Sequence, residues 1–141
     1  DRAKTALAAE MCGAAAASLT LSVEYAKIRK QFDRPIGTFQ AIQHKLADMK
    51  VVLETARSLT YYAGWSLDNE PKESRLATAM AKAYAGDACT HVVADAIQSH
   101  GGIGFTWEHD LHLYFKRVEA DALSYGDATH NRELVATLLG L

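Results

Sequence analysis

The spacing of apolar residues constrains the fold of this chain most strongly. Apolar side chains recur every three or four positions from about residue 2 to 31, 39 to 67 and 72 to 99, and each stretch would form a helix roughly 40–45 Å long. The two prolines, Pro35 and Pro71, fall in the polar breaks, where they interrupt no helical hydrogen bond. No alternating β-branched run is present. The pattern predicts an all-α fold, an up-and-down four-helix bundle.

Two shorter stretches complete the expected architecture. Asp110 to Ala120 would be the fourth helix, and about Thr129 to Leu139 a short extra C-terminal helix. Thr38 is the expected N-cap of the second long helix. The first helix should face the bundle with a narrow seam made of Leu7, Met11, Ala14, Ser18, Leu21, Tyr25, Ile28 and Phe32. The third helix should face the bundle with a seam whose middle part is made of small residues. This seam consists of Leu76, Met80, Ala83, Gly86, Thr90, Val93 and Ile97.

The bulk composition narrows the class of protein. The chain has 141 residues, 49% of them hydrophobic and 23% charged, which is enough for one domain over residues 1–141 with a core of its own. A net charge of −2 argues against nucleic acid as a partner. Cys12 and Cys89 lie in alanine-rich helical sequence, so we expect reduced core thiols. We expect no membrane span and no signal peptide, and a chain that starts at Asp1 suggests a piece of a longer protein.

Two sets of side chains could in principle bind a metal. Asp87, His91 and Asp95 share one helical face, as a metal site, a charge relay or a structural polar ladder would. We favour the ladder, because metal sites in bundles usually need Glu-x-x-His pairs and this chain has none. His109 and His112 could bind zinc only with a third ligand, so we favour surface or capping roles. We therefore expect no metal.

Three loop features leave alternatives open. The glycine-rich segment HGGIGF, His100 to Phe105, is either a helix C-cap or a set of bare N–H groups facing an anion. Arg29 and Gln40 flank the first turn, and together they could hold a phosphate, although Arg29 could equally pair with a surface carboxylate. Asp127 is either the N-cap of the last helix, which we favour, or a base for proton abstraction.

Two segments resemble a known family. YAKIRKQFDRPIGTFQAIQHKLADM, residues 25–49, and AKAYAGDACTHVVADAIQSHGGIGFTWEHDLHLYFKR, residues 81–117, are similar to the C-terminal helical domain of acyl-CoA dehydrogenases. The resemblance covers essentially the whole chain. It implies a flavoprotein that removes the α-proton of an acyl-CoA thioester while the β-hydride passes to flavin. It also implies an N-terminal helical domain and a middle β-domain that are absent from this chain.

The resemblance also implies a cofactor site. In the family, residues matching Arg29, Phe32 and Gln40 approach the FAD of a neighbouring subunit. The segment matching Gln98 to Gly102 contacts the adenosine diphosphate part of FAD, and the expected residues there are Gln98, His100, Gly101 and Gly102. The expected assembly is a homo- or hetero-oligomer, a dimer or a tetramer.

The catalytic base expected from the resemblance is missing. The family glutamate before the last helix aligns with Tyr125 or Gly126, and the alternative glutamate early in the first helix aligns with Ala3. Neither place holds a carboxylate. Two hypotheses follow: the chain belongs to the non-catalytic subunit of a hetero-oligomer, or Asp127 acts as a displaced base.

The resemblance therefore predicts the C-terminal domain of a FAD-dependent acyl-CoA dehydrogenase. The alternatives are a related flavoprotein of the same fold, such as an acyl-CoA oxidase or a flavin monooxygenase, and a purely structural oligomerisation bundle. The isolated domain should be inactive. The expected location is the bacterial cytoplasm, or the mitochondrial matrix of a eukaryote.

Overall fold

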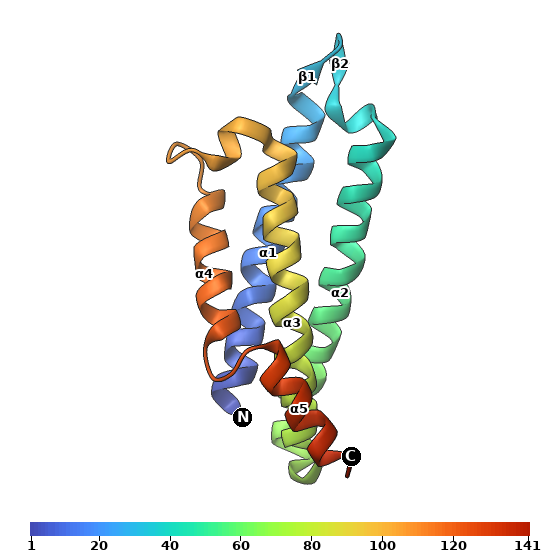
Figure 1. Cartoon of the computed structure of the whole chain (residues 1–141). Coiled ribbons are helices and arrows are strands. Elements are labelled where there is room, and N and C mark those ends of the chain that lie inside the picture. The colour runs from blue at the N-terminus through green and yellow to red at the C-terminus, as the bar shows by residue number, and fades with distance from the viewer.

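The computed structural model describes residues 1–141 and consists mainly of five α-helices (Figure 1). The four-helix bundle with an extra C-terminal helix is confirmed, and the ends of the helices lie within a few residues of those expected. The helices are α1 (Arg2–Ile28), α2 (Gln40–Asn69), α3 (Pro71–His100), α4 (Leu111–Leu123) and α5 (Ala128–Leu138).

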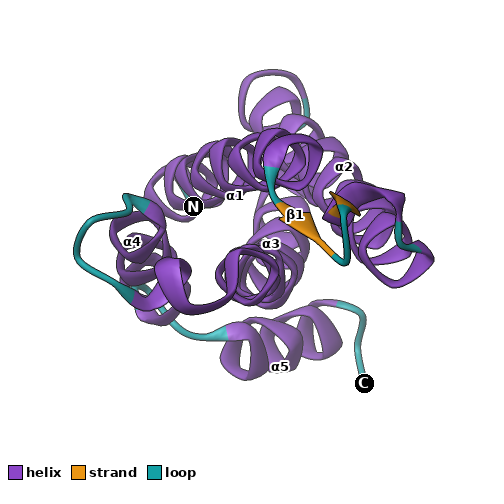
Figure 2. Ribbon diagram, turned by 90° about the horizontal axis from the view of Figure 1, so that it is seen from above, coloured by secondary structure: helices purple, strands orange, loops and turns teal.

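The helix α3 is the centre of the bundle. Seen from above, it lies among α1, α2, α4 and α5 (Figure 2). Its buried residues therefore surround most of its circumference instead of forming the narrow seam expected, and Met80, assigned to that seam, is 37% exposed. Small side chains permit this close packing on all sides. The buried residues of the middle part of α3 are Ala77, Thr78, Ala79, Ala81, Lys82, Ala83, Ala85, Gly86, Ala88 and Cys89.

The connection from α1 to α2 is a small β-hairpin that the sequence pattern did not indicate. The strands β1 (Lys30–Gln31) and β2 (Arg34–Pro35) pair antiparallel, and the 3-10 helix η1 (Ile36–Thr38) follows. The two turn residues, Phe32 and Asp33, adopt left-handed φ angles of 50° and 62°. This is the backbone that a two-residue hairpin turn requires.

Two expectations about this connection were wrong. Phe32 lies outside the seam of α1, because the helix ends at Ile28 and the Phe32 side chain is 87% exposed on the hairpin. Thr38 does not cap α2: its hydroxyl donates to the carbonyl of Pro35 at 2.7 Å, and Phe39 occupies the N-cap position.

Two further expectations concern the cysteines and the hydropathy of α1. Cys12 and Cys89 are free, buried thiols of one hydrophobic cluster, as expected. Contrary to expectation, α1 is long and apolar enough to cross a membrane by length and composition alone, with a mean hydropathy of 1.5 over its most apolar window. The core helix of a bundle passes the same test, and α1 packs against α2, α3 and α4.

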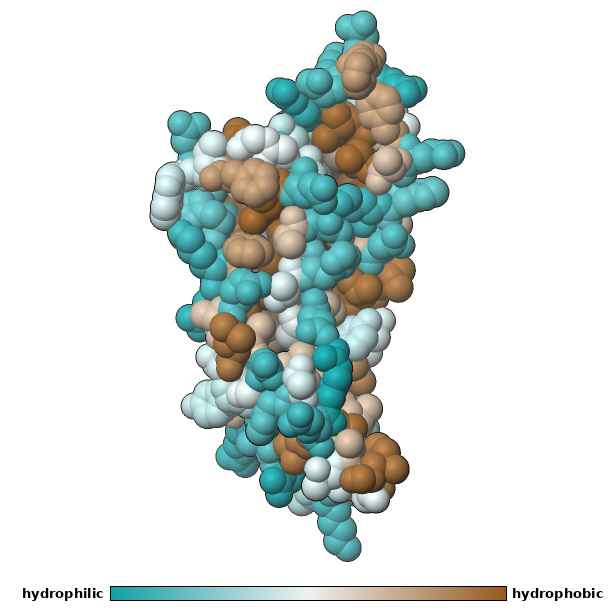
Figure 3. All heavy atoms as spheres, in the orientation of Figure 1, coloured by the Kyte–Doolittle hydropathy of each residue, from teal (hydrophilic) through white to brown (hydrophobic).

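The topology brings distant segments to the same end of the bundle. Figure 1 shows the α1–α2 hairpin and the 3-10 helix η2 (Gly101–Phe105), which follows α3, at one end, and the α4–α5 loop toward the other. Apolar side chains reach the surface near the hairpin end (Figure 3). The large exposed ones include Phe32 on the hairpin, Phe105 at the end of η2, and Trp107 two residues beyond it.

Candidate functional site

The hairpin and η2 together form a pocket of about 230 Å³ at the hairpin end, which we call the hairpin pocket. Two segments about 70 residues apart in sequence thus meet at one site. This is possible because the helices of an up-and-down bundle are antiparallel, so that the first and third connections lie at the same end. Of the seven residues expected at a cofactor site, five line this pocket. Its lining residues are Tyr25, Arg29, Gln31, Ile36, Gln98, Ser99, His100, Gly101 and Gly102.

Arg29 is positioned by the end of α1. Its backbone N–H donates to the carbonyl of Tyr25 at 2.8 Å, and its own carbonyl accepts from the N–H of Ile36 at 2.8 Å. The guanidinium forms no ion pair within the chain, unlike other arginines of the molecule, such as Arg57, Arg117 and Arg132. The expected alternative, a surface ion pair, is therefore not made. Free arginine donors in a pocket are typical of an anion site.

The glycines of η2 fall into two groups. A Cβ at Gly101 or Gly102 would meet no other atom within 4 Å, so bare backbone there leaves open space beside the pocket. A Cβ at Gly104 would lie 2.5 Å from the carbonyl oxygen of Ile97, so this glycine is required by packing. Gly101 also ends α3 with φ 64°. The segment is thus a helix C-cap, in which the N–H of Gly101 donates to the carbonyl of Gln98, and the alternative of N–H groups that face an anion stays a prediction.

His100 is a buried wall of the hairpin pocket. Its Nδ1–H donates to the carbonyl of Ala96 at 2.8 Å, and its Nε2 has no partner within the chain. The ring stacks on Tyr25 at 4.4 Å and meets the ring of His109 edge-on at 4.6 Å. Burial is the main cause that lowers the pKa of His100, so the imidazole is neutral at pH 7.

The other two residues expected at the cofactor site do not line the hairpin pocket. Phe32 is on the exposed hairpin turn, with its ring edge-on to Phe39 at 6.2 Å. Gln40 is the first residue of α2 and is exposed. An exposed phenylalanine with a positive φ is a strained arrangement, of the kind that clusters at functional sites.

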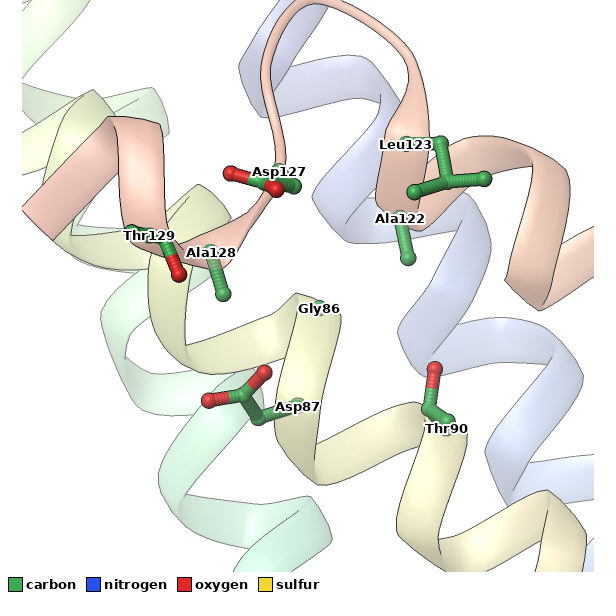
Figure 4. A pocket seen from close by; sticks show the side chains of 8 residues that line it. All are labelled: Gly86, Asp87, Thr90, Ala122, Leu123, Asp127, Ala128 and Thr129. Carbon is green, nitrogen blue, oxygen red and sulfur yellow. The ribbon is translucent and has the colours of Figure 1, made fainter.

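A second pocket of about 190 Å³ lies between α3 and the α4–α5 loop (Figure 4). Asp87 from α3 and Asp127 from the loop stand on either side of it. Asp127 is the N-cap of α5, as favoured, because its Oδ1 accepts from the N–H of His130 at 2.8 Å. Gly86 lines this pocket and Gly101 lines the hairpin pocket, and the 15 positions between them correspond to roughly 22 Å along α3.

The places expected for a catalytic glutamate carry no carboxylate in the structure either. Ala3 is exposed in the first turn of α1. Tyr125 is 66% exposed with φ 57°, and Gly126 has φ 92°. A Cβ at Gly126 would lie 2.2 Å from the ring of His130, an exposed side chain that could rotate away, but the positive φ of Gly126 still disfavours any larger residue there. The carboxylate next to these two positions in the sequence is that of Asp127.

The candidate metal ligands have structural partners. Asp87 pairs with Arg132 of α5, and Asp95 pairs with Lys45 of α2 at 2.8 Å, so these aspartates tie neighbouring helices to α3. His109 Nδ1 accepts from the N–H of Leu111 at 3.2 Å, which is a capping role. No group of three or more His, Cys, Asp or Glu side chains is close enough to hold a metal ion.

A buried lysine fixes the α4–α5 loop, and the sequence analysis missed it. Lys82 is fully buried, and its Nζ donates to the carbonyls of Ala122 at 2.8 Å and Gly126 at 3.0 Å. Asn131, also fully buried, donates to the carbonyl of Gly126 at 2.8 Å and accepts from Lys4 at 2.7 Å. The signal was present in the sequence, since Lys82 interrupts an alanine-rich stretch in the middle of a central helix.

Comparison with known proteins agrees with the fold and the motifs. The family profile described as "Acyl-CoA dehydrogenase, C-terminal domain" matches residues 1–139. The chain belongs to the acyl-CoA dehydrogenase family. The curated relatives of this acyl-CoA dehydrogenase domain include Acyl-CoA dehydrogenase IpdE2 of Mycobacterium tuberculosis, 48% identical over 86% of the chain and 36% of the relative. IpdE2 of Mycolicibacterium smegmatis is 43% identical over 89% of the chain and 39% of the relative.

Solved structures share the whole architecture of this acyl-CoA dehydrogenase domain. A steroid ACAD variant, Tcur3481–Tcur3483, has a TM-score of 0.93 at 33% identity and covers 97% of the chain. The ChsE4–ChsE5 complex of Mycobacterium tuberculosis has a TM-score of 0.92 at 30% identity and covers 98%. PigA with FAD and proline has a TM-score of 0.92 at 32% identity and covers 99%.

The chain spans little more than a third of each of these proteins: 38% of the Tcur3481–Tcur3483 chain, 37% of the ChsE4–ChsE5 chain and 36% of the PigA chain. At the level of the family, the relatives are oxidoreductases named as acyl-CoA dehydrogenases. The solved structure of PigA contains FAD, as its name states.

Proposed function

We propose that this chain is the C-terminal domain, residues 1–141, of a FAD-dependent dehydrogenase that acts on acyl-CoA thioesters, and that it contributes the hairpin pocket to a FAD site between subunits. The observation that carries the proposal is the convergence of Arg29 with Gly101 and Gly102 on one pocket. N-terminal helical and middle β domains would lie outside this chain, and a bacterial cytoplasmic location fits its bacterial relatives.

The residues present fit the phosphate part of FAD. Arg29 offers a guanidinium without a carboxylate partner, and Gly101 and Gly102 leave backbone exposed where a side chain would otherwise project. When bound, FAD would supply the hydride acceptor for dehydrogenation. The part of this chain is to hold and orient the dinucleotide: Arg29 balances phosphate charge, while Phe32 on the hairpin and Gln40 at the start of α2 extend toward an adjoining subunit.

The first test is flavin retention by the full-length protein. We expect Arg29→Met to weaken FAD binding roughly 10-fold or more, because a charge-assisted hydrogen bond to phosphate contributes about 1.5–3 kcal/mol. Flavin absorbance and titration of the apoprotein with FAD measure the effect. The matched control is Arg34→Met, which removes an arginine from the same hairpin that stacks on Phe39 at 4.1 Å and does not line the pocket.

Two results would reject the proposed site. If the wild-type protein retains no flavin, the chain is a structural oligomerisation bundle. If Arg29→Met and Arg34→Met bind FAD equally well, the hairpin pocket is not where the phosphates bind.

We further propose that this chain belongs to the non-catalytic subunit of a hetero-oligomer. Neither usual glutamate position holds a carboxylate, and Asp127 is already engaged as the N-cap of α5. Two structural neighbours have names that pair two proteins, Tcur3481–Tcur3483 and ChsE4–ChsE5, and the latter is called a complex. A partner subunit would then supply the base that removes the α-proton of the thioester.

Asp127→Asn separates the two hypotheses about the base. Asparagine caps a helix about as well as aspartate, so the substitution should leave the fold intact. We expect turnover of the assembled enzyme to stay within roughly twofold of wild type, because under this proposal Asp127 only caps α5. Loss of a general base would instead typically cost about a hundredfold or more. Steady-state kinetics of the full complex measure this, and a hundredfold loss would show instead that Asp127 is the base.

A further inference from the structure

The hydrogen bond from Lys45 decides which end of the Gln98 side-chain amide faces that lysine. Lys45 Nζ lies 2.7 Å from Gln98 Oε1, and a lysine ammonium can only donate hydrogen bonds. The carbonyl oxygen of the amide must therefore face Lys45. The Nε2 group, with its two hydrogens, is at the other side, and it makes no hydrogen bond within the chain. Gln98 lines the hairpin pocket, and its two amide hydrogens have no acceptor within the chain.

Lys45 is itself held in place from a different helix. It lies on α2, and its Nζ donates to Oδ1 of Asp95 on α3 at 2.8 Å. The other carboxylate oxygen of Asp95 faces Nε2 of His91 at 3.3 Å. The side chains of Lys45 and Asp95 are only 26% and 18% exposed, so solvent competes with this pair less than with a fully exposed one.

We propose that Lys45 is a positioning residue that fixes Gln98 with its amide hydrogens directed to the hairpin pocket, where they donate to an acceptor-rich anionic group. This inference rests on the proposed function, under which that group is the pyrophosphate of FAD. Lys45 acts through Gln98 and does not touch the ligand. Asp95 belongs to the same arrangement, because it sets where the ammonium of Lys45 lies.

The test is FAD binding by the full-length apoprotein. We expect Lys45→Met to weaken binding roughly 3- to 10-fold, the effect of a single hydrogen bond whose donor is no longer oriented. Lys45→Arg keeps N–H donors for both Gln98 and Asp95 and should retain most of the affinity. The matched control is Lys50→Met, which removes another lysine of α2 that, like its partner Glu54, does not line the pocket.

A double-mutant cycle shows whether Lys45 acts through Gln98. In a Gln98→Ala background, Lys45→Met should cause no further loss of FAD affinity, because the amide that it positions is gone. The inference is overturned if Lys45→Met binds FAD as tightly as Lys50→Met, or if its effect persists undiminished in the Gln98→Ala background. If the wild-type protein takes up no FAD, the proposed function itself fails, and this inference with it.

Discussion

Gly104→Ala should destabilise the bundle by about 1–3 kcal/mol, the usual range of substitutions that overpack a rigid site. The added Cβ would lie 2.5 Å from the carbonyl oxygen of Ile97 and 3.1 Å from the Cβ of His100. Both belong to the last turn of α3, whose backbone is fixed by the surrounding helices. The clash cannot be relieved by rotating a side chain, so η2 must move away from α3.

Gly102→Ala is the matched control for this prediction. A Cβ at Gly102 meets no atom within 4 Å, so the substitution should leave stability unchanged within about 0.5 kcal/mol. Chemical denaturation followed by circular dichroism measures both variants. The packing argument fails if the two lose equal stability. Gly102→Ala should instead lower flavin retention, since the methyl group projects beside the hairpin pocket.

Lys82→Met should also cost about 1–3 kcal/mol of stability, the penalty for an orphaned buried polar group. Methionine keeps the volume of the side chain but removes the Lys82 donor from the carbonyls of Ala122 and Gly126, of which Gly126 keeps the Nδ2 donor of Asn131. Burial, and secondarily the charge of Lys4, lower the pKa of Lys82, so part of the loss is offset when the buried amine is removed.

The control for Lys82→Met is Lys72→Met, which removes an exposed lysine from the first turn of the same helix. Hydrogen exchange should additionally show faster exchange in the loop between α4 and α5 of the Lys82 variant. If the two variants are equally stable and the loop exchanges no faster, Lys82 does not hold that loop.

The sequence was sufficient for the helices and for the end at which the site forms. Antiparallel long helices place alternate connections at the same end, so Arg29 and Gly102 could be expected to meet before any contact was known. Asp127 could be recognised as a cap because it directly precedes a helical stretch. These features depend on local pattern and chain order.

Other features depend on neighbours that a local pattern does not reveal. The hairpin turn uses Phe32 and Asp33, and this pair lacks the glycine that normally marks a turn of this type. Thr38 has the chemistry of a cap, but its hydroxyl donates to Pro35 instead. The role of Lys82 became evident only once α4 and α5 were placed against α3, since its acceptors are 40 and 44 residues away in sequence.

The central position of α3 has a consequence for how this domain can vary. Four other helices rest on its surface, and the contact layer there consists largely of alanine methyl groups. One enlarged side chain on α3 would displace more than one neighbour, whereas an equal change on the outer face of α2 would displace none. Divergence among proteins of this architecture should therefore be slowest along α3, and the distance between the hairpin and the α4–α5 loop should change least.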